Sequence, residues 1–148
     1  MTRYLPDVNV LLAMALSGHP HHRAAAAWLD EVADSDEVIV CRATQQSLLR
    51  LLTTTAVFAA FDEEPLTNEE AWAVADAFLA DPRFRLADVE PPGAPAAWRG
   101  YSTRMSSSPK VWTDAWLAAF ALCADARFVT NDVAFRSYRG LDPILIPH

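Results

Sequence analysis

Three aspartates that are far apart in the sequence each lie beside a short apolar segment. Asp7 directly follows the apolar run at 4–6. Asp132 comes shortly after the run at 128–130, and Asp114 stands near the start of a long apolar segment. A buried carboxylate is costly unless it has a partner or a cation. We therefore expect the three carboxylates to converge around a divalent metal ion, which would offset their mutual repulsion.

The segments that must position these acids alternate between short strands and helices. Strands are expected at 4–7, 38–41, 84–89, 127–130 and 143–146. Helices are expected from residue 9 onward and at 20–33, 43–54, 67–79, 96–104 and 113–124. Uninterrupted apolar strands joined by helical crossovers indicate a three-layer α/β/α fold with a mainly parallel sheet. We expect residues 1–148 to form a single domain.

The carboxyl ends of parallel strands are where such sheets gather their functional residues. Each aspartate also has a simpler explanation. Asp7 could be a turn residue, Asp114 an acid favoured by the helix dipole, and Asp132 a helix N-cap. Their coincidence at one edge of the predicted sheet favours the metal site over three unrelated structural roles.

The helix expected at 113–124 has a face of small residues. Ala118, Ala121 and Asp125 follow Asp114 at helical spacing, so these four side chains should share one face. Small residues let the helix approach the sheet closely, and this approach would bring Asp114 to the strand ends.

Composition narrows the functional class. The chain has 148 residues, 52% of them hydrophobic, and a net charge of −7. This charge argues against nonspecific coating of nucleic acid, because the phosphates would be repelled. The two cysteines, Cys41 and Cys123, suggest buried apolar packing rather than a zinc site. Without an apolar run long enough to span a membrane, we expect a soluble, cytoplasmic protein.

Three stretches of the sequence together resemble the PIN-domain family, and within it the VapC-type toxins. They are 7–12 (DVNVLL), 113–119 (TDAWLAA) and 129–135 (VTNDVAF). The resemblance implies a metal-dependent ribonuclease, using Mg²⁺ or Mn²⁺, that a cognate VapB-type antitoxin neutralises. It also implies a homodimer. The ion would polarise the scissile phosphate of RNA and activate a water for attack.

The same resemblance assigns roles to particular residues. Asp7, Asp114 and Asp132 correspond to the family's metal-binding, catalytic acids. Asn9 and Thr130 correspond to polar residues that line the pocket.

One position departs from the family. A glutamate is usual on the helix after the second strand, and here the resemblance places Gln45 in that position, with Gln46 as the alternative in register. An amide can orient a water or a phosphate, but it cannot act as a base or hold a hard cation as tightly. This departure allows three outcomes: weaker metal binding, one bound ion where relatives hold two, or loss of activity.

Several other residues have two interpretations each. Five cationic residues could either contact RNA phosphates or be solvated surface charges: Arg42, Arg50, Arg99, Arg104 and Lys110. Five apolar residues could either form a groove for an antitoxin segment or belong to the ordinary core: Leu48, Leu49, Leu52, Phe58 and Phe61. The tract His19, His21 and His22 is interpreted as a solvated helix start rather than a metal site.

Two other functions compete with the nuclease. A dehalogenase-like or receiver-type phosphoryl-transfer domain also has an aspartate after its first strand, but dehalogenase-like enzymes need a second aspartate where this chain has Asn9. Lys110, the only lysine, does not follow a predicted strand as that chemistry requires. The second competitor is a PIN-like binding module that has lost catalysis, an interpretation that Gln45 supports.

Overall fold

The sheet at the centre of the molecule has five strands in the order β3-β2-β1-β4-β5. The structure is a computed structural model, and it describes residues 1–147. The strands are β1 (Arg3–Pro6), β2 (Glu37–Cys41), β3 (Phe84–Ala87), β4 (Arg127–Thr130) and β5 (Ile144–Leu145). All four neighbouring pairs are parallel, which confirms the predicted sheet. Two strands are shorter than predicted, since β3 ends at Ala87 and β5 has two residues.

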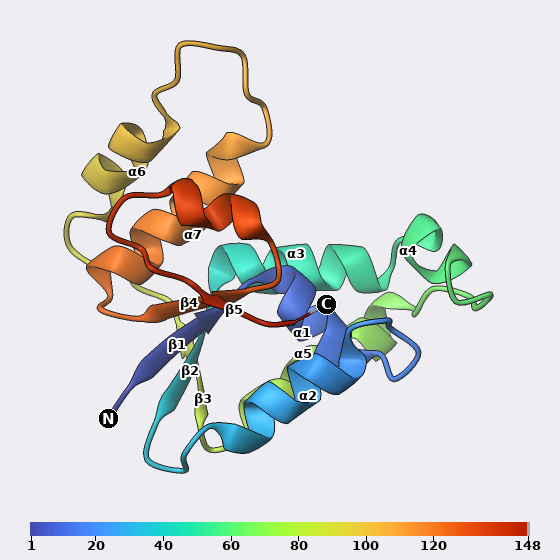
Figure 1. The fold of residues 1–148 in the computed structure, drawn as a ribbon. Helices are drawn as coiled ribbons and strands as arrows, with labels where there is room; N and C mark the ends of the chain where they lie inside the picture. The colour runs from blue at the N-terminus through green and yellow to red at the C-terminus, as the bar shows by residue number, and fades with distance from the viewer. Residues whose placement is uncertain (148) are drawn as a thin grey trace.

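Helices cover the sheet on two sides (Figure 1). They are α1 (Val8–Ala15), α2 (His22–Glu31), α3 (Arg42–Leu52), α4 (Thr55–Ala59), α5 (Asn68–Ala80), α6 (Ala94–Ser102) and α7 (Val111–Cys123), with a 3₁₀ helix at Val133–Ser137. The helices α6 and α7 lie on one side, while α1, α2 and α5 lie on the other. The predicted α/β/α arrangement is confirmed.

Alternate residues of the strands supply the two hydrophobic layers. In β2, Ile39 packs with α7, whereas Val38 and Val40 pack with α1, α3 and α5. In β4, Phe128 and Val129 divide between the two sides in the same way. Because both faces are buried, positions 38–41 of β2 and 128–129 of β4 are all apolar, and this explains the uninterrupted apolar runs.

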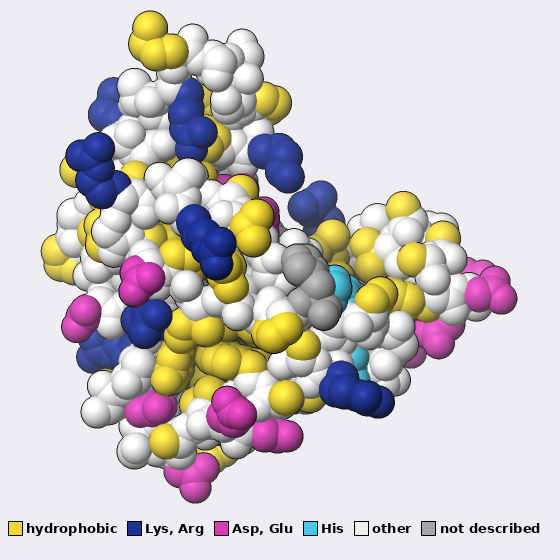
Figure 2. All heavy atoms as spheres, in the orientation of Figure 1, with side chains coloured by type: hydrophobic (Ala, Val, Ile, Leu, Met, Phe, Trp, Pro, Cys, Tyr) yellow, Lys and Arg dark blue, Asp and Glu magenta, His cyan; other side chains and the backbone are white. Residues whose placement is uncertain are grey.

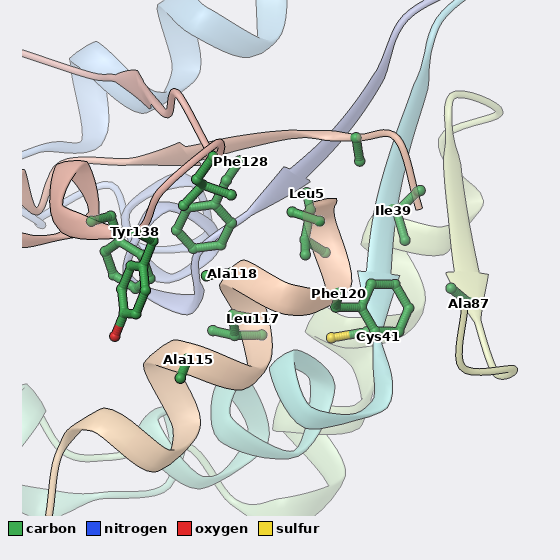
Figure 3. Packing of buried hydrophobic residues seen from close by; sticks show 14 of the residues in the cluster. Leu5, Ile39, Cys41, Ala87, Ala115, Leu117, Ala118, Phe120, Phe128 and Tyr138 are labelled. Atoms are coloured by element: carbon green, nitrogen blue, oxygen red, sulfur yellow. The ribbon is translucent and has the colours of Figure 1, made fainter. Parts of the chain in front are cut away.

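The helix α7 packs closely on the sheet through small side chains. Ala115, Ala118 and Ala121 are fully buried and contribute to the cluster around Leu5 and Phe128 (Figure 3). The close approach predicted for this helix is therefore present.

The shared helical face does not extend to Asp125. The helix ends at Cys123, and Asp125 is exposed with a φ of 54°. Its left-handed conformation belongs to the turn into β4, so the small-residue face ends at Ala121.

Thr67 starts α5 with the expected capping box. Its hydroxyl accepts from the backbone N–H of Glu70 at 3.1 Å, and its own N–H donates to the Glu70 carboxylate at 2.9 Å.

The segment between α3 and α5 contains a helix that the sequence did not predict. This helix, α4, projects from the body of the molecule (Figure 1). Phe58 anchors it in the core.

The apolar groove considered for an antitoxin segment is largely core. Leu48, Leu52 and Phe58 are buried together, while Leu49 and Phe61 are partly buried beside them. Among the described residues, no helix is long and apolar enough to cross a membrane.

Candidate active site

Asp7 lies at the carboxyl end of the central strand β1. The parallel register places Pro6 beside Val129 of β4, and the backbone N–H of Asp7 donates to the carbonyl of Val129 at 2.8 Å. The side chain is 5% exposed. The Thr130 hydroxyl donates to Oδ2 of Asp7 at 3.0 Å, so the end of β4 fixes one oxygen of this carboxylate.

The environment of Asp7 disfavours its negative charge. Burial raises its pKa from 3.8 to about 6, and the nearby charges of Asp114 and Asp132 act in the same direction. Hydrogen bonds from Thr130 and from the backbone of Val8 lower the pKa but do not outweigh burial. A bound cation would reverse this balance by favouring the ionised carboxyl.

Asp114 lies in the first turn of α7 and is half-buried. Burial raises its pKa, the charge of Asp132 raises it further, and Lys110 opposes both effects. The N-terminus of α7 favours an acid at this position through the helix dipole, which was the simpler explanation offered for Asp114. That role is compatible with a site, because Asp114 also interacts electrostatically with both other acids.

Asp132 follows β4 and caps the 3₁₀ helix. Its Oδ1 accepts from the backbone N–H of Ala134 at 2.9 Å, so the N-cap prediction holds. Its own N–H donates to the Thr130 hydroxyl at 3.0 Å. Thr130 thus accepts from the backbone of Asp132 while it donates to Asp7, and one hydroxyl links the two acids.

The three aspartates lie at one edge of the sheet, but they do not form a closed ligand set. Among residues 1–147, no group of three His, Cys, Asp or Glu side chains is arranged to hold a metal ion. The donors themselves fit a hard cation, since they are carboxylate oxygens whose charges repel one another. Magnesium retains several waters and takes few carboxylates, so an open cluster of this kind suits it better than a cage would.

Gln45 is the buried member of the glutamine pair. It is 6% exposed, whereas Gln46 is exposed, so the helix α3 turns Gln45 inward. The Arg42 guanidinium donates to Oε1 of Gln45. In the described part of the chain, no hydrogen bond joins Gln45 to the three aspartates. Its amide carbonyl is engaged by Arg42 instead.

Asn9 lies on the first turn of α1 and is exposed. Together with Asp132 it lines a cavity of about 750 Å³ beside the acids. Asn9 therefore lies near the acids. Among the described residues, no hydrogen bond joins Asn9 to the buried carboxylate of Asp7.

The predicted RNA-contacting cations are all exposed. Lys110 is close enough to Asp114 to influence its pKa. Arg99 and Arg104 line a second cavity, of about 1030 Å³, with Trp98 and Trp112. Figure 2 shows Lys and Arg side chains over the part of the surface formed by α6 and the start of α7. Positive charge is thus available locally despite the net charge of −7.

Tyr138 is a neighbour of the site that the sequence did not indicate. It is buried, and Arg104 lies 5.8 Å from the centre of its ring. Burial raises its pKa, with further contributions from the charges of Asp114 and Asp132. No motif marks this residue, since it comes after the 3₁₀ helix in an irregular segment.

Comparison with known proteins gives one consistent result. The family model for the PIN domain matches residues 4–141. Ribonuclease VapC41 of Mycobacterium tuberculosis is 54% identical over 138 residues, which cover 93% of this chain and 94% of that protein.

Solved structures share the fold at low sequence identity. The VapC20 toxin of Mycobacterium tuberculosis, which cleaves the sarcin–ricin loop, is 15% identical, with a TM-score of 0.65 over 97% of this chain and 99% of the other. VapBC2 of Rickettsia felis, bound to a DNA fragment from its promoter, is 14% identical, with a TM-score of 0.65 over 97% of each chain.

Proposed function

Because this chain belongs to the PIN-domain family, we propose that it is a divalent-metal-dependent endoribonuclease and the toxin of a toxin–antitoxin pair. Its catalytic residues are Asp7, Asp114 and Asp132. The observation that supports this assignment is the electrostatic interaction among the three acids at the carboxyl edge of the sheet.

Each acid contributes in a different way. Burial of Asp7 removes water around its carboxylate and strengthens its interaction with any cation. Thr130 fixes one oxygen of Asp7, and Ala134 engages one oxygen of Asp132. Oxygen lone pairs that these hydrogen bonds do not use would bind the ion. Asp114 is supplied by the first turn of α7.

Mg²⁺ or Mn²⁺ would be held by these three carboxylates, and when bound it polarises a phosphate and lowers the pKa of a water. Lys110, near Asp114, would neutralise phosphate charge as the RNA approaches. Gln45 would orient a water or a phosphate through its amide N–H groups, since Arg42 already engages its carbonyl oxygen.

The partners follow from the relatives. We infer that a cognate VapB-type antitoxin neutralises the toxin and that the toxin forms a homodimer. The net charge of −7 suits a partner with a basic segment. Coexpression with the neighbouring short reading frame, followed by co-purification and measurement of the mass of the complex, tests both points.

One alternative retains a specific observation in its favour. Gln45 replaces the acid that is usual in the family, and its carbonyl oxygen is occupied by Arg42. A binding module that has lost catalysis would explain both facts. For the phosphoryl-transfer alternative no such observation exists among the described residues, because Lys110 lies on the α6–α7 loop and not after a strand.

The deciding experiment is an RNA-cleavage assay with the purified protein. Wild type should cleave RNA with Mg²⁺ and lose the activity with a chelator, whereas Asp7→Asn and Asp114→Asn should be inactive in either condition. Asp76→Asn, which removes an exposed carboxylate on α5, is the matched control and should behave as wild type. Expression of the active forms should arrest growth. Equal cleavage by wild type and both site variants would refute the assignment.

A further inference from the structure

A pocket beside the acids has no role in the proposed chemistry. It is the cavity of about 750 Å³ that includes Asn9 and Asp132. Its other walls are the turn between α1 and α2 and the projecting helix α4. We call it the His19–Phe61 pocket, lined by Asn9, His19, His21, Val57, Phe61 and Asp132, among others. In Figure 2, histidine side chains are visible at the foot of the projecting segment.

Aromatic rings form one wall of the pocket. The rings of His19 and Phe61 are 5.9 Å apart and tilted by 51°. Phe61 in turn packs edge-on against Phe58, whose ring is buried in the core. This anchoring fixes the position of the aromatic wall although α4 has only five residues. The wall is therefore a pre-formed surface for a flat ligand.

The ring of His19 is held by a hydrogen bond within its own turn. Nδ1 of His19 accepts a hydrogen bond from the backbone N–H of His21 at 3.0 Å, an arrangement that requires an unprotonated Nδ1. Burial of His19 lowers its pKa, and the neighbouring His21 and His22 act in the same direction. Among the described residues that line the pocket, none is Lys or Arg. A phosphate group would find no guanidinium or ammonium group there.

Polar groups also line the pocket. Asn9 and Asn131 each offer an amide with donors and an acceptor. Single-stranded RNA is recognised by this combination, in which an unstacked base stacks on an aromatic side chain and its edge forms hydrogen bonds. The pocket contains both elements.

We propose that the His19–Phe61 pocket binds one unstacked base of the RNA strand, next to the phosphate held at the acids. This inference rests on the proposed function. Asp132 belongs both to the acid cluster and to the pocket wall, so the two sites adjoin at this residue. The base and the scissile phosphate therefore belong to neighbouring nucleotides, and the pocket contributes to the choice of cleavage site.

The test measures sequence preference with ring-removing variants. Wild type, Phe61→Leu and His19→Ala cleave an RNA pool with a random segment, and the products are sequenced. Phe78→Leu is the matched control, because it removes a half-buried ring that packs on Phe84 in α5 and β3, away from the pocket.

Stacking of one base contributes roughly 5-fold to 100-fold in binding. We expect wild type and Phe78→Leu to prefer one base at a position flanking the cut, and Phe61→Leu and His19→Ala to reduce that preference to less than about twofold. An unchanged preference in both pocket variants overturns the proposal. So does an equal loss of cleavage for every sequence, which indicates a structural role.

A second measurement does not depend on cleavage. Asp7→Asn protein is irradiated with the same pool carrying 4-thiouridine and 6-thioguanosine, and the crosslinked peptides are identified by mass spectrometry. Crosslinks in 18–22 or 55–61 support the proposal even if the wild type fails to cleave RNA, which would refute only the proposed catalysis. Crosslinks confined to other segments, or a complete absence of crosslinks, overturn the proposal. This result is expected if the pocket instead binds a segment of a partner protein.

Discussion

The hydroxyl of Thr130 donates a hydrogen bond of 3.0 Å to Oδ2 of Asp7, although the two residues are 123 positions apart. The parallel pairing of β1 with β4 makes this contact possible, because it places the carboxyl ends of both strands side by side. The same hydroxyl accepts from the backbone N–H of Asp132. Thr130 therefore positions two candidate catalytic acids at once.

Thr130→Val should move the pH dependence of cleavage upward. The hydrogen bond from Thr130 lowers the pKa of Asp7, so its removal raises a pKa that is already about 6. The protonated carboxyl cannot bind a cation, and half-maximal activity should shift to higher pH by about one pH unit. Rate measurements between pH 5 and 9, with a fixed Mg²⁺ concentration, provide the check. Thr130→Ser keeps the hydroxyl and should keep the wild-type profile; an identical shift in both variants would contradict this explanation.

Without metal, the protein should lose stability as the pH rises from about 4 to above 6. The pKa of Asp7 is 3.8 when unperturbed and about 6 in the folded protein, so folding favours the protonated form. The favourable contribution is complete below the unfolded pKa and is lost as the pH rises through the folded value. Thermal unfolding in a chelator at pH 5 and pH 7.5 should show the loss, and added Mg²⁺ should reverse part of it at pH 7.5.

Asp7→Asn isolates this effect, because asparagine keeps an oxygen for Thr130 but carries no charge. At pH 7.5 without metal, it should be more stable than wild type by roughly 2 kcal/mol. Asp76→Asn, on the exposed face of α5, should change stability little. A destabilised Asp7→Asn protein would mean that burial does not disfavour the Asp7 charge.

Much of the fold could be predicted because its strands are buried on both faces. Adjacent residues such as Val38 and Ile39 pack into different layers, so both must be apolar and the strand is visible as a continuous run. Asp7 and Thr130 stand at the ends of two such runs, and sheet geometry brings them together. These parts of the candidate site depend only on strand position.

Other parts could not be predicted, because they depend on contacts between irregular segments. The helix α4 has five residues and begins at the last of three consecutive threonines, so it is too short for a helical period to be detected. The approach of His19 to Phe61 joins a turn to the end of that helix. Tyr138 reaches the acids from a segment without regular structure. No local signal in the sequence encodes these tertiary contacts.

Gln45→Glu should strengthen metal binding. Gln45 is buried on α3 and replaces the acid expected from the family, so a carboxylate there adds negative charge close to the strand ends. Arg42 already donates to this side chain and would pair with the new carboxylate. The Mg²⁺ concentration for half-maximal cleavage should fall by about tenfold.

The neighbouring position supplies the control for that change. Gln46→Glu adds the same charge one residue away, on the exposed side of α3, and should leave the metal requirement unchanged. If both variants reduced the Mg²⁺ requirement equally, a general electrostatic effect would account for the result. If neither cleaved RNA and wild type were also inactive, the binding-module alternative would gain support.

Ala118→Leu should separate α7 from the sheet and displace Asp114. Ala118 is fully buried one turn after Asp114, against the cluster that includes Leu5 and Phe128. Three extra carbons in this close-packed layer should cost about 1–3 kcal/mol of unfolding free energy. Urea unfolding measures that cost, and Ala77→Leu on the exposed face of α5 should stay within about 0.5 kcal/mol of wild type. Because the helix carries Asp114, a proposed catalytic acid, cleavage by folded Ala118→Leu protein should fall at least about tenfold, a loss larger than the unfolded fraction explains. Full activity in the folded variant would show that the close packing of α7 is needed for stability alone and does not position Asp114.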